Sequence, residues 1–148
     1  MKLVTLIALA LVIRASYATL GFDSISTLST STFQCLGNNG YSSFIARVAS
    51  TNGVDNVGVQ NIKNAISAGL TDVDAYIAPC PASCVSASNQ VQNAINAIQT
   101  AGITVGTIWL DIVANPDWSS DISTNRQFIN DMITTAQGPM CFSDFEHF

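Results

Sequence analysis

The feature that most constrains the fold is a regular alternation of short apolar, β-branched runs with longer stretches in which apolar residues recur every three or four positions. The short runs, at 19–25, 41–49, 73–78 and 104–113, have the character of strands. Their centres recur roughly every 30 residues, about the length of a unit in which a helix connects two parallel strands. We therefore predict an α/β chain of four βα units around a parallel sheet.

The stretches between these runs predict helices. The clearest is an apolar stripe of Val59, Ile62, Ile66 and Leu70, which ends near Gly69. Residues 53–56 are predicted only to turn the chain. The other predicted helices pass through Phe33 to Leu36, from Ser86 to Ala101 and from about Ser123 to Gln137.

The fourth run contains a carboxylate. Residues Thr107 to Val113 are mostly apolar, which is typical of a strand covered on both faces, and Asp111 is their single acidic residue. The carboxyl ends of parallel strands are where α/β proteins build their active sites, so Asp111 is a candidate site residue. An equally simple interpretation is that Asp111 turns the chain or caps the next segment.

The amino terminus has the three parts of a secretory signal peptide. Lys2 supplies the basic region, an apolar run extends from Leu3 to Ile13, and small residues precede a cleavage point after Ala18. The apolar run is well short of the roughly 20 residues that a membrane span needs. The protein is therefore expected to be secreted and extracellular. We divide the chain into a signal peptide (1–18), one domain (19–137) and a divergent tail (138–148).

The charge balance argues against two classes of partner. Without the first 18 residues, the three cationic side chains of Arg47, Lys63 and Arg126 oppose ten acidic ones, a net charge of −7. Such a surface repels nucleic acids and anionic membranes, because binding to their phosphates depends on Lys and Arg. We expect neither nucleic acid nor membrane as a partner.

Four cysteines in an exported chain predict disulfides, and four cysteines allow three pairings. Cys80 and Cys84 could close a small local loop, which would leave Cys35 and Cys141 to pair if the geometry permits. The single histidine, His147, lies beside the chain end, so neither a zinc site nor a Ser-His-Asp or Cys-His nucleophile is supported. No metal and no cofactor are expected.

Four segments in a fixed order resemble one enzyme family. They are Gly21-Phe22-Asp23, Phe44 to Val48, Asp72 to Cys80 and Ile108 to Ile112. Together they resemble the glycoside hydrolase family 25 lysozymes, specifically the branch found in nematodes and amoebae. The resemblance implies a (β/α) barrel that cuts the glycan of bacterial peptidoglycan between N-acetylmuramic acid and N-acetylglucosamine. It also implies peptidoglycan as the partner, and a role in innate defence against bacteria or in their digestion.

The resemblance implies an acidic site that has lost one member. The family signature at the end of the fourth strand is Asp-x-Glu, in which the Glu is the proposed proton donor, and this chain has Asp111-Ile112-Val113 there. A hydrocarbon side chain cannot protonate the leaving oxygen of a glycosidic bond. The only glutamate, Glu146, lies in the tail. Asp23 and Asp111 are the catalytic residues that remain by resemblance, unless they are ordinary strand-end turn residues, and hydrolysis is expected to be crippled.

Other side chains could contact the sugar. Asp74 could line the mouth of the site, although an Asp72-x-Asp74 pair at the start of a strand is as often a solvated edge. Tyr76 could stack on a sugar or pack internally, and Trp109, which alternates with aliphatic residues, is predicted to pack in the core. Trp118 lies in a polar loop, where an aromatic side chain more readily contacts a ligand. The predicted substrate-binding residues are Asp74, Tyr76 and Trp118.

The chain resembles only the amino-terminal half of a (β/α)8 barrel. A closed barrel has eight βα units in roughly 250 residues, and the residues past Gln137 are too few for four more units. A truncated gene or splice form would explain this. Three functions stay open: a lysozyme-like hydrolase with impaired catalysis, a non-catalytic module that binds peptidoglycan or acts as a decoy, and a non-functional truncated isoform.

A half-barrel should expose unpaired strand edges and an uncovered inner face, which favour association between chains. We predict that the secreted chain self-associates through its sheet edges or is poorly soluble. Analytical ultracentrifugation and thermal melting check this, and a clean monomer with one cooperative unfolding transition would contradict it.

Overall fold

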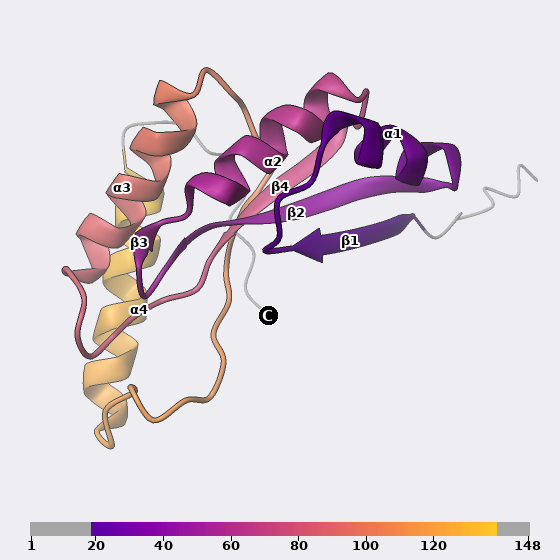
Figure 1. Cartoon of the computed structure of the whole chain (residues 1–148). Helices are drawn as coiled ribbons and strands as arrows, with labels where there is room; N and C mark the ends of the chain where they lie inside the picture. Colours follow the sequence, from indigo (N-terminus) through magenta and orange to yellow (C-terminus); the bar gives the residue numbers. More distant parts are fainter. Residues whose placement is uncertain (1–18, 139–148) are drawn as a thin grey trace, which may run out of the picture.

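The computed structural model describes residues 19–138 (Figure 1). The predicted signal peptide at 1–18 and nearly all of the predicted tail, with Cys141, Glu146 and His147, lie outside the described residues. Within the described range, no helix combines the length and the apolar character needed to cross a membrane.

Four parallel strands, each followed by a helix, make up the fold, so the predicted α/β class and its four βα units are confirmed. The sheet has the order β1-β2-β4-β5, and the short β3 pairs antiparallel with the end of β2. In chain order the elements are β1 (Leu20–Ser24), α1 (Thr30–Asn38), β2 (Tyr41–Ser50), β3 (Gly53–Val54), α2 (Asn56–Ser67), β4 (Asp72–Ile77), α3 (Ala87–Thr100), β5 (Ile108–Leu110) and α4 (Ile122–Ala136).

Two details of the strand prediction were wrong: the length of the fourth strand and the absence of a strand at residues 53–54. The fourth strand was predicted over 104–113, yet β5 has only three residues, and the segment after it is exposed. The reason lies in its partner: β4 ends at Ile77, whose carbonyl accepts the Asp111 N–H at 2.9 Å, and beyond that bond β5 has no described strand to pair with. Residues 53–54, predicted only to turn, form β3 because they pair with Ala49 and Ser50.

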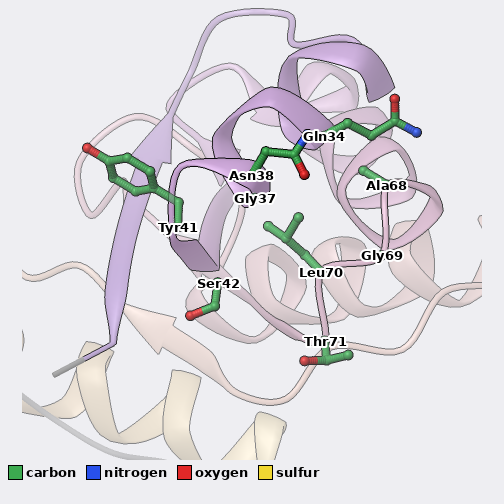
Figure 2. A pocket seen from close by; sticks show the side chains of 9 residues that line it. All are labelled: Gln34, Gly37, Asn38, Tyr41, Ser42, Ala68, Gly69, Leu70 and Thr71. Carbon is green, nitrogen blue, oxygen red and sulfur yellow. The ribbon is translucent and has the colours of Figure 1, made fainter. Parts of the chain in front are cut away.

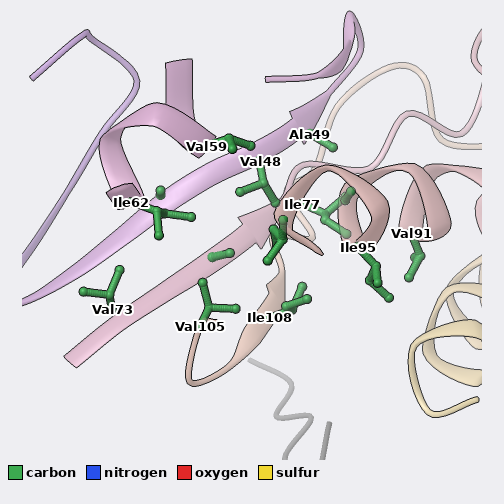
Figure 3. Close-up of a cluster of buried hydrophobic side chains, with 14 of the residues drawn as sticks. Val48, Ala49, Val59, Ile62, Val73, Ile77, Val91, Ile95, Val105 and Ile108 are labelled. Atoms are coloured by element: carbon green, nitrogen blue, oxygen red, sulfur yellow. The ribbon is translucent and has the colours of Figure 1, made fainter. Parts of the chain in front are cut away.

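The helices cover one face of the sheet. Helices α1, α2 and α3 lie on the same side of the strands, and α4 packs against α3 (Figure 1). On that side Phe44, Ala46 and Val48 of β2 are fully buried, together with Ile77 of β4 and Ile108 of β5. Figure 3 shows part of this cluster between the strands and the helices. The alternate residues of each strand point to the other side, because side chains alternate along a strand.

The other side, here called the open face, carries polar and aromatic side chains that are partly buried or exposed. Strand register places Asp23, Ile45 and Asp74 in one row across it, and Arg47, Tyr76 and Trp109 in the next. The sequence predicted a fourth strand covered on both faces, and this is wrong: Trp109 is only partly buried, whereas Ile108 is 1% exposed. Within residues 19–138, β1 and β5 each pair along one edge only.

Each helix begins at a side chain that accepts its first free N–H groups. Ser29 caps α1, Asp55 caps α2, Ser86 caps α3 and Asp121 caps α4. Such a cap stabilises a helix by about 1 kcal/mol. The four caps explain why these helices start where they do, within a few residues of the starts that their apolar stripes predict.

A buried amide fixes the segment after β1. Asn61 on α2 has no exposed surface; its Oδ1 accepts the Leu28 N–H at 2.9 Å and its Nδ2 donates to the Ser26 carbonyl at 2.8 Å. Asn64, one turn later, donates to the Leu28 carbonyl at 2.7 Å. These bonds satisfy the amide, and they hold the chain just beyond the carboxyl end of β1, where Asp23 lies.

The first turn of α2 packs directly against β2 because residue 58 is a glycine. A Cβ on Gly58 would overlap the carbonyl oxygen of Arg47. We predict that Gly58→Ala lowers the free energy of unfolding by about 3 kcal/mol, the upper end of the range typical of substitutions that overpack a core. Gly37→Ala in α1 is the matched control, since its Cβ would meet only Leu70 Cδ1 at 3.9 Å, and it should be neutral or slightly stabilising. Urea unfolding of both variants measures the difference, and equal stability would contradict the prediction.

Candidate functional site

The carboxyl edge of the sheet brings three predicted site residues into one neighbourhood. Asp23 is the penultimate residue of β1, Tyr76 is the penultimate residue of β4, and Asp111 directly follows β5. The strands are parallel, so these positions meet at the same edge. Both carboxylates are exposed, and Tyr76 is partly buried between the strands that carry them.

The electrostatics of Tyr76 indicate the same grouping. Burial raises the pKa of the Tyr76 phenol above its usual value of 10.0, the charge of Asp23 raises it further, and Asp111 adds a smaller effect of the same sign. Arg47 acts in the opposite direction and lowers this pKa. A carboxylate on β1 and another just after β5 can disfavour one phenolate only if both lie near it. Tyr76 therefore lies within the field of both acids.

Arg47 is a residue of this face that the sequence analysis did not single out. Its Nε and Nη2 donate to Asp55 Oδ2 at 3.0 and 2.9 Å, and the other oxygen of Asp55 accepts the N–H groups of Val57 and Gly58. The ion pair is partly exposed, with side-chain exposures of 27% and 13%, so its direct contribution to stability is about 1 kcal/mol or less. Strand alternation, which buries Phe44, Ala46 and Val48, was the signal that could have placed Arg47 here.

Asp74 lies in the middle of the open face, and protein donors engage both of its oxygens. Oδ1 accepts the Thr107 N–H at 2.8 Å, and Oδ2 accepts the indole Nε1–H of Trp109 at 2.8 Å. The prediction that Asp74 contacts a sugar stays a prediction. The predicted core location of Trp109 is wrong, because its indole reaches a carboxylate on the open face and the residue is only partly buried.

Trp118 and Val113 lie together in the loop after β5. The Trp118 Nε1–H donates to the Val113 carbonyl at 2.9 Å, and the Trp118 ring packs edge-on against Phe128 of α4, with centroids 5.9 Å apart. These contacts give Trp118 a packing role, and its predicted contact with sugar stays a prediction. The Val113 side chain is 52% exposed. The residue at the expected acid position is therefore exposed, but it has no proton to donate.

Two hollows in the described part of the chain are lined by none of the predicted site residues. One, of about 560 Å³, lies at the amino ends of β2 and β4, the opposite end of the strands from Asp111 (Figure 2). Gln34, Asn38, Tyr41 and Leu70 are among the residues that line it. The other, of about 290 Å³, lies between β3 and the start of α3, and its walls include Cys84. Neither contains a carboxylate, so neither provides the chemistry predicted for the carboxyl edge.

One predicted disulfide is present. Cys80 and Cys84 are bonded, and Gln90 of α3 holds this loop through bonds to both the N–H and the carbonyl of Cys80. Cys35 is an exposed free thiol among residues 19–138. Its pairing with Cys141 stays a prediction, because Cys141 lies outside that range. Over the same range, no group of three or more His, Cys, Asp or Glu side chains could hold a metal ion.

The fold is similar to part of an autolysin and to part of the catalytic domain of an endolysin. The structure of the modular autolysin LytC of Streptococcus pneumoniae matches with a TM-score of 0.68 over 86% of this chain and 31% of that one, at 16% identity. The catalytic domain of endolysin ply40 from Listeria monocytogenes bacteriophage P40 matches with a TM-score of 0.61, over 83% of this chain and 61% of that one, at 13% identity. At these identities the likeness shows the fold alone.

The sequence comparisons then identify the family. The family model described as Lysozyme-like protein 1 matches residues 14–148, and the chain belongs to this family. Lysozyme-like protein 5 of Caenorhabditis elegans is 49% identical over 119 residues, 79% of this chain and 55% of that protein. Probable GH family 25 lysozyme 4 of Dictyostelium discoideum is 35% identical over 118 residues, 79% of this chain and 54% of that protein. The predicted resemblance is confirmed, and the chain spans about half the length of the curated relatives it matches.

The grouping at the carboxyl edge predicts a titration effect. Asp23→Asn should lower the pKa of Tyr76 towards 10.0, because it removes the carboxylate whose charge raises it most, and Asp111→Asn should lower it by less. The ultraviolet absorbance of tyrosinate measures the titration, and Tyr76→Phe assigns it. Asp131→Asn on α4 is the control and should leave the curve in place. Unchanged curves in both site variants would contradict the grouping.

Proposed function

We propose that this chain is a secreted lysozyme-like protein that binds the glycan of bacterial peptidoglycan at the carboxyl edge of its sheet and hydrolyses it poorly. The corresponding role is defence against bacteria, or their digestion. The single observation that carries the proposal is the position of Asp23, Tyr76 and Asp111 at the carboxyl ends of parallel strands of one sheet, in a chain that belongs to a lysozyme-like family.

The composition of this edge supports a sugar as the ligand. Asp23 and Asp111 are anionic and exposed, and the partly buried ring of Tyr76 lies near them. Carboxylates accept hydrogen bonds from hydroxyl groups, and an aromatic ring offers an apolar face beside them. An anionic ligand would meet repulsion here, since the cation beside Tyr76, Arg47, is already paired with Asp55. One matched structure is that of LytC in complex with a synthetic peptidoglycan ligand, which supports the same class of ligand.

The residue at 113 is the reason to propose weak hydrolysis. Cleavage of a glycosidic bond needs an acid that protonates the leaving oxygen. Val113 is exposed at the position where the family resemblance expects that acid, and residues 19–138 contain no glutamate. General acid catalysis contributes about 10² to 10⁴ in rate, or roughly 3 to 5 kcal/mol. A loss of this size leaves binding as the main remaining activity.

A purely non-catalytic module that binds peptidoglycan, or acts as a decoy, is the second candidate. The same carboxyl edge favours it, because sugar contacts do not depend on an acid at position 113. A non-functional truncated isoform is the third. Hydrolysis, binding without hydrolysis, and neither activity are distinct experimental outcomes.

We predict that restoring the acid raises activity. In the Val113→Glu variant of the secreted protein, release of soluble muropeptides should rise by about 10² or more over the native chain. Asp111→Ala should remove the release and weaken co-sedimentation with peptidoglycan. Ile66→Glu, which adds the same acid to an exposed apolar position on α2, is the matched control and should change neither.

The outcomes separate the three functions. Co-sedimentation of the native chain with little release supports the proposal, and gain of release in Val113→Glu identifies the missing acid as the defect. Co-sedimentation with no release in any variant supports the non-catalytic module. Robust release by the native chain would contradict impaired catalysis, and no co-sedimentation at all would contradict peptidoglycan binding.

A further inference from the structure

We propose that Asp74 is a positioning residue: its carboxylate holds the indole of Trp109 on the open face beside Tyr76, and the two rings form a platform for the apolar face of a pyranose sugar. The ligand rests on the proposed function above, whereas the positioning itself rests on geometry alone.

The first support is the pair of bonds made by one carboxylate. Asp74 Oδ2 accepts the Trp109 Nε1–H at 2.8 Å. Asp74 Oδ1 accepts the backbone N–H of Thr107, which precedes Trp109 by two residues, also at 2.8 Å. Hydrogen bonds to an ionised acceptor are roughly twice as strong as neutral ones. One bond orients the indole and the other ties the same carboxylate to the chain just before β5. The ring is therefore held relative to its own backbone.

The second support is the register of the two strands. Tyr76 of β4 lies opposite Trp109 of β5, and Asp74 precedes Tyr76 by two residues on the same face. The indole of Trp109 therefore reaches diagonally across to β4, a contact that long aromatic side chains can make. The register thus places Tyr76 and Trp109, both partly buried, at neighbouring positions of the open face, one residue before the ends of β4 and β5.

The third support is the absence of a side chain at Gly106. A Cβ at this position would lie 2.7 Å from Asp74 Oδ1, a distance shorter than Cβ atoms in proteins show to other heavy atoms. The Gly106 N–H donates to the Val73 carbonyl at 3.0 Å. Only a residue without a side chain lets the carboxylate approach the Thr107 N–H in this way. Gly106 thus makes room for the carboxylate that holds Trp109.

The chemistry of the platform favours a neutral carbohydrate. Aromatic rings present a negative π face, to which the weakly positive C–H bonds of a sugar ring are attracted, and their apolar surface favours desolvation of that side. A ring that is held before binding loses less side-chain entropy when the ligand arrives, and this raises affinity. The orientation of Trp109 would then set which face of the sugar is accepted.

The positioning role is tested in the ligand-free protein. We predict that Asp74→Ala speeds exchange of the Trp109 indole N–H with solvent by about tenfold or more, measured by ¹H–¹⁵N NMR, because a methyl group cannot accept that bond. Trp109→Phe assigns the signal. Asp72→Ala is the matched control, since it removes the same carboxylate from the same strand, and it should leave exchange unchanged. Equal exchange in Asp74→Ala and the native chain would overturn the positioning role.

The platform is tested by a double-mutant cycle on peptidoglycan co-sedimentation. Asp74→Ala should weaken retention about tenfold in the native chain and have no further effect in the Trp109→Phe background, because Asp74 acts through that indole. Gly106→Ala, which keeps the Asp74 carboxylate but displaces it, should weaken retention in the same way. An equal loss from Asp74→Ala in both backgrounds would overturn the proposal, since Asp74 would then contact the sugar itself.

Indole exchange and peptidoglycan co-sedimentation test the positioning role and the proposed function separately. If the native chain is not retained by peptidoglycan, the proposed function and the sugar platform are both overturned, while the indole exchange rates still decide whether Asp74 holds Trp109. Melting curves of each variant show whether a loss of retention reflects unfolding. A variant that loses retention at an unchanged melting temperature and with faster indole exchange supports the proposal.

Discussion

The parallel pairing of β2 with β1 on one side and β4 on the other is the constraint on which the rest of the structure depends. Parallel strands end at a common edge, so this pairing brings Asp23 and Tyr76 together, and the pairing of β4 with β5 adds Asp111. The register also decides which side chains share a row, because a shift of one residue would move every side chain to the opposite face. The covered core, the open face and the acidic edge all depend on it.

The polar residues of the open face connect elements that the core alone would not align. Asp55 begins α2 and pairs with Arg47 of β2, and Gly58 lets the first turn of that helix approach the same strand. Asp74 connects β4 to the start of β5. The net energy of a partly exposed ion pair is small, so the geometry that such pairs impose matters more than their contribution to stability. The acidic edge is positioned largely by residues that do not belong to it.

The strand–helix alternation predicted the four βα units correctly because each element carries its own periodic pattern. The short fourth strand could not be predicted this way, because its length depends on where β4 ends, and no local pattern in Thr104 to Val113 records that. Trp109 was misplaced for a related reason: an apolar neighbourhood indicates burial, yet the partner of its indole is a carboxylate 35 residues earlier. The candidate acids were found from their positions at strand ends, whereas Arg47 and the role of Gly106 were not.

The sequence by itself determined the class of the fold, the starts of the helices and the candidate acids, since these depend on residue periodicity, capping side chains and motifs that are local in the chain. It also determined that a valine stands where the family resemblance expects a proton donor. Only the tertiary structure decided which face of the sheet is open, that Asp23 and Asp111 both act on Tyr76, and that Asp74 engages Trp109. The physical reason is that these relations depend on strand register and on hydrogen bonds between residues far apart in sequence, which no local pattern encodes.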